Sequence, residues 1–225
     1  MDLKNWFKTK GSLGVVVLAL GAVGFCWYPL TPIFGSWAAF FSIKAMLVPL
    51  AGAFAGVWGA ALITGLRLLV RSFWGAALDA HILAHYLPGL CASLSWATRS
   101  IFIHVGLPFL CMFLFVVHPV GAQVWYYSLY WLIPVGMYMR NNKLSAVFLS
   151  ALGSTFIAHA VGSVIWLYTV PMSASVWRAL VPVVAVERLV FAAGMSAGYC
   201  VIAYGMRNMS SGWPLVWGYV RSLKI

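Results

Sequence analysis

The sequence has 225 residues, of which 64% are hydrophobic and only 8% are charged, and its mean hydropathy is +0.96. A soluble domain carries about 25% charged residues, and no water-soluble fold has enough interior to hide this much apolar surface, so the composition predicts an integral membrane protein. The formal charge of +11 comes from basic residues scattered singly between apolar runs, which favours membrane lipid as a partner and excludes a binding stripe for nucleic acid.

The apolar windows predict an all-α fold, a polytopic membrane helix bundle of six transmembrane helices that forms a single domain over residues 1–225. A helix needs about 20 apolar residues to cross a bilayer. The qualifying windows lie, in chain order, at 12–28, 37–66, 100–117, 123–139, 145–169 and 180–205. The first window follows a basic stretch, as a signal peptide does, but no small-residue cleavage site follows it, so we expect it to remain as a span.

Two stretches leave the count open, up to eight spans. The window 37–66 is too long for one straight helix, and Pro49 followed by Gly52 could divide it. The stretch 73–98 could be a further span, a helix lying in the interface, or a re-entrant pair broken at Pro88 and Gly89.

The basic residues predict the orientation, because cytoplasmic loops are enriched in Lys and Arg. The six-span layout places one group of basic residues on the same side as the N-terminal lysines: Arg67, Arg71, Arg99, Arg140, Lys143, Arg207, Arg221 and Lys224. Only Arg178 falls on the other side. We therefore expect a multi-pass protein of the cell (cytoplasmic) membrane with both termini in the cytoplasm.

Two charged residues lie inside the predicted last span. Glu187 and Arg188 are in an otherwise apolar stretch, and such residues face the bundle interior and find partners. Neighbours on a helix diverge by about 100°, so each is expected to need a partner on another helix. Lys44, the one lysine far from a membrane end in this layout, is a candidate partner for Glu187.

The window 145–169 carries a polar stripe. Thr155, His159, Ser163 and Trp166 share one helical face, and lipid cannot satisfy such a face. One interpretation is hydrogen bonding between helices; the other is a cavity that holds a polar or amphipathic ligand. The predicted ligand-binding residues are therefore His159, Ser163, Trp166, Thr155, Glu187, Arg188 and Lys44.

Three further residues, Asp79, His81 and His85, are secondary candidates. The histidines share a helical face, but two histidines alone do not make a metal site, and a polar edge at the membrane interface is the favoured interpretation. The four cysteines lie in apolar stretches without a CxxC pair. We predict no metal and no cofactor. The GxSxG pattern at Gly194–Gly198 is interpreted as close helix packing, because a nucleophile elbow needs a strand–turn–helix context.

The run from Pro32 to Leu66 resembles the second and third helices of the substrate-binding (S) components of energy-coupling-factor vitamin transporters. The resemblance lies in the small residues Leu50-Ala51-Gly52, Gly56, Gly59-Ala60 and Gly65. It implies six helices with cytoplasmic termini, a vitamin or metal ion bound near the outer face, and a separate ATPase module as the source of energy.

These patterns predict a transport protein that binds a small ligand within its helices and, lacking a Walker motif, relies on a separate partner for energy. One alternative is a membrane-embedded enzyme acting on a lipid, with His159 and Glu187 as acid and base. Another is a structural subunit of a membrane complex. The sequence leans against an enzyme, and no catalytic residue is assigned.

Overall fold

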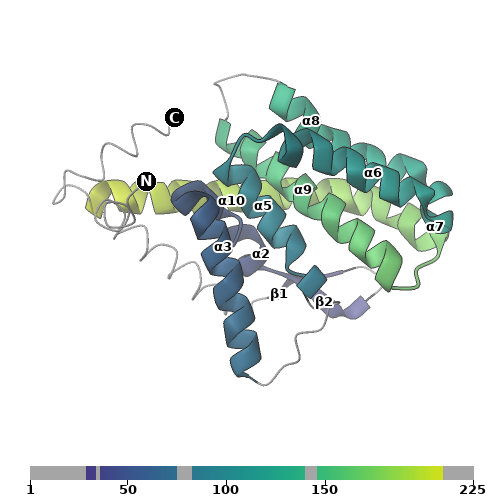
Figure 1. Ribbon diagram of the computed structural model, residues 1–225, viewed down its shortest axis with the longest axis horizontal. Helices are drawn as coiled ribbons and strands as arrows, with labels where there is room; N and C mark the ends of the chain where they lie inside the picture. The colour runs from purple at the N-terminus through teal and green to yellow at the C-terminus, as the bar shows by residue number, and fades with distance from the viewer. Residues whose placement is uncertain (1–28, 34–35, 75–82, 140–145, 210–225) are drawn as a thin grey trace.

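A computed structural model describes residues 29–33, 36–74, 83–139 and 146–209 (Figure 1). Almost all of them are helical, which confirms the helical class. The predicted span 12–28 lies outside the described residues, as do Asp79 and His81. The elements are β1 (Pro29–Ile33), β2 (Ser36–Ser42), α2 (Ile43–Leu47), α3 (Leu50–Phe73), α5 (Leu87–Ala97), the π-helix η1 (Phe102–Gly106), α6 (Leu107–Val117), α7 (Pro119–Ala122), the 3-10 helix η2 (Trp125–Trp131), α8 (Leu132–Met139), α9 (Ala146–Thr169) and α10 (Ala174–Met209). The strands β1 and β2 pair with each other in antiparallel orientation.

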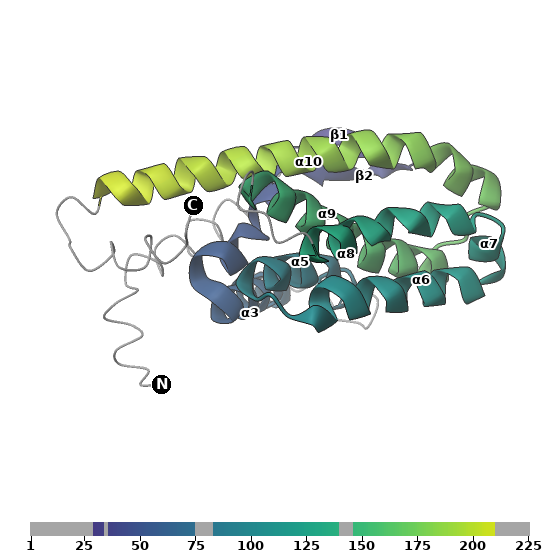
Figure 2. The ribbon, with the colours of Figure 1, turned by 90° about the horizontal axis from the view of Figure 1, so that it is seen from above.

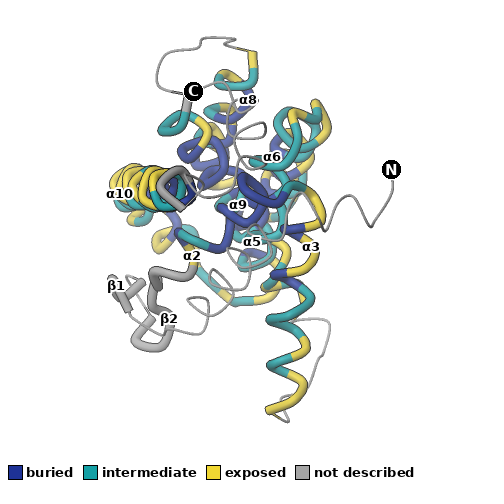
Figure 3. Tube along the Cα trace, turned by 90° about the vertical axis from the view of Figure 1, so that its left-hand side faces the viewer, coloured by how far each residue is buried: buried dark blue, intermediate teal, exposed yellow. Residues whose placement is uncertain are grey.

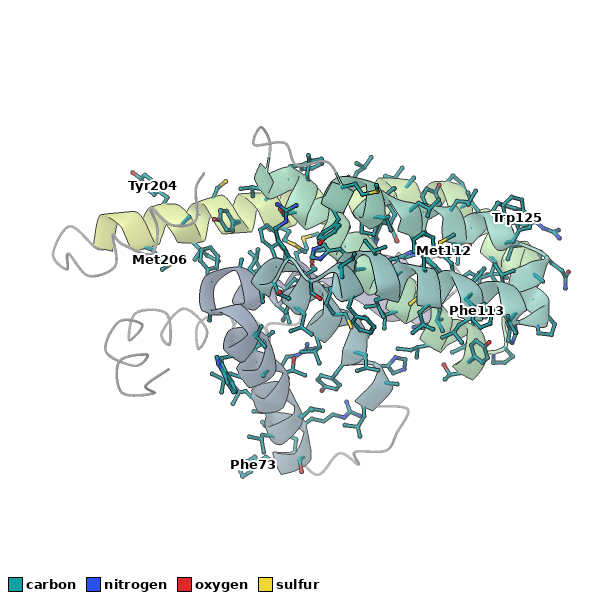
Figure 4. The ribbon with its side chains drawn as sticks, turned by 45° about the horizontal axis from the view of Figure 1, so that its top comes forward. Phe73, Met112, Phe113, Trp125, Tyr204 and Met206 are labelled. Carbon is teal, nitrogen blue, oxygen red and sulfur yellow. The ribbon has the colours of Figure 1, made fainter. Side chains whose placement is uncertain are left out.

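Three helices of the described chain are long and apolar enough to cross a membrane: Leu50–Phe73, Val147–Thr169 and Ala174–Met206. The predicted six spans are not confirmed, and Phe102–Val117 is a shorter apolar helix. Large apolar side chains also cover the outside; Phe73 is 88% exposed and Phe113 is 64% exposed (Figure 4). Both observations support association with a membrane, where lipid covers such surfaces.

The structure describes helices in both of the stretches, 37–66 and 73–98, that left the number of spans open. The window 37–66 divides at Pro49, as predicted, but Gly52 does not break the helix. A second irregularity lies at Gly56, whose φ of 63° is left-handed and thus suits a glycine. In the stretch 73–98, α5 has 11 residues and is about 16 Å long, too short to cross a bilayer. Pro88 lies in its first turn, where proline is tolerated, so of the three alternatives the break at Pro88–Gly89 is not found.

Helix α9 is the centre of the molecule, with α5, α6, α8 and α10 packed around it (Figure 3). Small residues make these contacts close, as the glycine and serine spacing predicts. Ser154 of α9 donates a 3.0 Å hydrogen bond to the carbonyl of Ala92 on α5. On α10, a Cβ at Gly194 or Gly198 would meet the side chains of Met46 and Leu47 on α2. The GxSxG pattern is thus a packing surface, and its Ser196 hydroxyl bonds the carbonyl of Ala192 on its own helix.

The helical segments after residue 100 run back and forth along one axis (Figures 1 and 2). The turn around α7 and the turn between α9 and α10 lie at one end, where His118 and Val120 line a surface hollow together with residues 167–173. At the opposite end, the Arg99 guanidinium donates to the carbonyl of Tyr138 at 3.3 Å. Helix α3 instead runs across this axis, with its end at Phe73 away from the bundle (Figure 4). Elements other than α9 and α10 therefore form the remaining walls of the space between these two helices.

Candidate ligand-binding cavity

A cavity of about 850 Å³ lies between α9 and α10 and is walled on its other sides by α5, η2, Ala45 of α2, Val48 and Pro49 before α3, and Arg67 of α3. Cavities of roughly 300–1,000 Å³ are the usual size for small-molecule sites. The polar and aromatic lining consists of Arg67, His85, Tyr127, Thr155, His159, Ser163, Trp166, Ser173, Trp177, Glu187 and Arg188. Side chains from five parts of the chain therefore meet around one hollow.

The rest of the lining is apolar, and part of it follows α10. Residues from Val176 to Met195 contribute, a separation of about 28 Å along the helix. Leu180, Val184 and Phe191 lie between those two residues on the same wall. The cavity is therefore long and largely apolar, and the polar side chains are distributed along it.

The predicted polar stripe of α9 faces this cavity: Thr155, His159, Ser163 and Trp166 all line it. Glu187 and Arg188 line it from α10. Thr155 is also satisfied locally, because its hydroxyl donates to the carbonyl of Leu152 at 2.9 Å. The structure thus brings together six of the seven first-rank candidates.

His159 is held by two aromatic residues of η2. The indole Nε1 of Trp131 donates to Nδ1 of His159 at 3.1 Å, and the Tyr127 hydroxyl lies 2.9 Å from Nε2. An indole nitrogen can only donate, so Nδ1 is the acceptor and the ring carries its proton on Nε2. The Nε2–H group then donates to the Tyr127 oxygen. Ser163, one helical turn along, lies 3.4 Å from the same nitrogen.

Glu187 and Arg188 pair with each other, with 3.6 Å between Nη2 of Arg188 and Oε2 of Glu187. The two neighbours therefore do face each other, which the 100° divergence argued against. The 100° divergence describes where the side chains start, and these two are long enough to bend back together. The Arg188 guanidinium also lies 4.5 Å from the ring centre of Phe191, a favourable cation–π position.

The remaining candidates are placed less closely. His85 lines the opposite wall, with its ring 6.4 Å from that of Trp166. Lys44 belongs to α2 by its backbone, but its side chain lies outside the described residues, so its pairing with Glu187 stays a prediction. Among the described residues, no group of three or more potential metal ligands is found.

Four of the lining residues listed above were missed by the sequence patterns: Arg67, Tyr127, Ser173 and Trp177. Arg67 was assigned to a cytoplasmic membrane end, whereas its guanidinium lies over the ring of Tyr86, 4.8 Å from its centre, beside the cavity. Tyr127 and Trp177 are each 2% exposed, although Tyr127 lies near the start of the predicted span 123–139 and Trp177 lies between the predicted spans 145–169 and 180–205. Their own segments carry no periodic signal, because only the packing of η2 and α10 against α9 buries them.

Comparison with known proteins identifies no relative of this chain: no family model matches, no curated protein matches, and no solved structure matches.

Proposed function

We propose that this protein is a membrane transport protein that binds a small polar or amphipathic ligand in the cavity between α9 and α10. The observation that supports this most is the convergence of buried polar side chains from α9, α10 and η2 on one mainly apolar cavity. Separate hydrogen-bond pairs that only join helices would need no such space between them. In the proposal the chain is a substrate-binding subunit, similar to an S component, that a separate ATPase module energises.

The orientation in the membrane is part of the same proposal. The α7 turn and the α9–α10 turn share one end of the bundle, and Arg99 lies at the other. The excess of basic residues then places the Arg99 end and both termini in the cytoplasm. The cavity is lined as far as Val170–Ser173 of the α9–α10 turn, so its ligand would enter from the outer side.

An enzyme acting on lipid fits this geometry less well. His159 bonds Trp131 and Tyr127, while Glu187 pairs with Arg188, so the two supposed acid and base groups belong to different hydrogen-bond groups. Nδ1 of His159 already accepts from Trp131 and Nε2 carries the proton, which leaves the neutral ring without a free lone pair for proton abstraction.

The test is native mass spectrometry of the full chain, extracted mildly and held in lipid nanodiscs. We expect a small molecule to be retained by the parent protein and by Ser196→Ala, whose hydroxyl bonds its own helix. We expect retention to fall at least about tenfold in His159→Ala, which removes the ring that holds the hydroxyls of Tyr127 and Ser163 in the cavity wall. A folded parent protein that retains no small molecule, or equal retention in both variants, would contradict the proposal.

A further inference from the structure

The polar lining of the cavity has an excess of hydrogen-bond donors, and the arrangement around His159 is the reason. Because Trp131 occupies Nδ1, the Nε2 atom is a donor and cannot accept a proton from a neighbouring hydroxyl. The hydroxyl hydrogens of Tyr127 and Ser163, whose oxygens lie 2.9 Å and 3.4 Å from Nε2, therefore cannot be used on His159. The two hydroxyls also hydrogen-bond each other, which uses one of the two hydrogens and leaves the other for a ligand. Both side chains line the cavity.

A third donor lies beside them. The indole Nε1 of Trp177 is buried, and within the described chain no acceptor is in hydrogen-bond range of it. Trp177 is 2% exposed, lines the cavity, and packs edge-to-face against Tyr127 with 5.0 Å between ring centres. A buried N–H group without an acceptor lowers the stability of the folded protein. This wall of the cavity therefore has a hydrogen-bond donor that a ligand acceptor would satisfy.

The charges of the lining also favour a ligand with hydrogen-bond acceptor atoms. Two arginines, Arg67 and Arg188, line the cavity against one glutamate within the described residues. That glutamate is already paired with Arg188. A cationic ligand would find no unpaired carboxylate there, whereas acceptor oxygens would meet donors from η2, α9 and α10.

We propose that the cavity selects a small amphipathic carboxylate, whose oxygens accept from Trp177 and from the hydroxyl pair of Tyr127 and Ser163, and whose apolar body lies along α10. Aromatic neighbours such as Trp166 and Phe191 line the same space and suit an aromatic or aliphatic body. This inference rests on the proposed function, since it names the class of ligand that the same cavity takes.

The experiment compares three probes that share one apolar body: 4-phenylbutyrate, 4-phenylbutan-1-ol and 4-phenylbutylamine. Each is titrated calorimetrically into the full chain in nanodiscs. We expect the carboxylate to bind at least about tenfold more tightly than the alcohol or the amine, because hydrogen bonds to a charged acceptor are the stronger ones. Trp177→Phe keeps the ring and removes the donor, so it should reduce this preference severalfold with little effect on the alcohol.

Trp125→Phe is the matched control, since Trp125 is 54% exposed at the end of the bundle (Figure 4) and is not one of the residues that line the cavity. It should keep the preference for the carboxylate. Tighter binding of the amine, or equal losses for all three probes in Trp177→Phe, would overturn the donor assignment and leave the proposed ligand cavity standing. Binding of none of the probes, together with an empty parent protein in native mass spectrometry, would overturn both. If only water satisfies these donors, Trp177→Phe will leave the preference unchanged, which also overturns the inference.

Discussion

At the scale of single residues, η2 determines the chemical state of His159. A histidine in an apolar span has two possible neutral tautomers, and the stripe on α9 does not choose between them. The hydrogen bond from Trp131 determines the tautomer, because an indole N–H can only donate. One hydrogen bond from a neighbouring helix thereby decides which groups around His159 remain available to a ligand.

The first prediction concerns Trp131→Phe. Trp131 is buried and His159 is half-buried at the cavity wall, so the variant leaves Nδ1 of His159 without its donor inside the bundle. We expect the free energy of unfolding to fall by about 1–3 kcal/mol, measured by denaturant titration in mild detergent.

The exposed Trp125 provides the comparison, because Trp125→Phe makes the same chemical change at the surface. It should alter the free energy of unfolding by no more than about 0.5 kcal/mol. Equal effects of the two substitutions would show that the bond to His159 contributes nothing specific.

At the scale of elements, small residues set how closely the helices approach. Gly52 of α3 lies so near α5 that a Cβ would collide with the carbonyl oxygen of Ser93. Ser93 in turn donates to the carbonyl of Val48 at 3.1 Å, which ties α5 to the start of α3. These contacts position Val48, Pro88 and Gly89 as walls of the cavity.

The second prediction compares two glycines of the same helix. Gly52→Ala should lower the free energy of unfolding by at least about 1–3 kcal/mol, because the backbone of α5 must move away. At Gly65 an added Cβ meets nothing within 4 Å, so Gly65→Ala should be neutral or stabilise α3 by up to about 1 kcal/mol through helix propensity. Thermal unfolding of the two variants side by side tests this, and the reverse order would contradict the packing of α3 on α5.

At the scale of the whole molecule, the alternating helical segments define two ends. Gln123 and Ser175 are exposed at the end that carries the α7 and α9–α10 turns, and Met139, which is 77% exposed, lies at the end of α8 near Arg99. In the proposed orientation, the distribution of basic residues assigns the Arg99 end to the cytoplasm and the other end to the outside.

The third prediction uses single cysteines placed in a background without the four native ones. We expect a membrane-impermeant thiol reagent to label Gln123→Cys and Ser175→Cys in intact cells and to leave Met139→Cys unlabelled until the cells are opened. Labelling of Met139→Cys alone would reverse the proposed orientation. Labelling of only one of the two positions Gln123 and Ser175 would contradict the placement of the α7 turn and the α9–α10 turn at the same end of the bundle.

The sequence by itself determined the helical membrane class, the positions of α9 and α10, and the side of α9 that is polar. These follow from composition and helical periodicity, which are local properties. It also indicated the small residues that bring helices together, as at Ser154 and Gly194.

Only the tertiary structure decided which polar groups share a cavity and how they pair. Tyr127, Trp177 and Arg67 enter the cavity wall through contacts between segments far apart in the chain, and no periodicity within one segment encodes such contacts. Likewise, Glu187 and Arg188 pair because their side chains bend towards each other, a choice that depends on the walls around them and not on their spacing. The helical faces were therefore readable from local sequence, whereas the cavity is a property of the packed molecule.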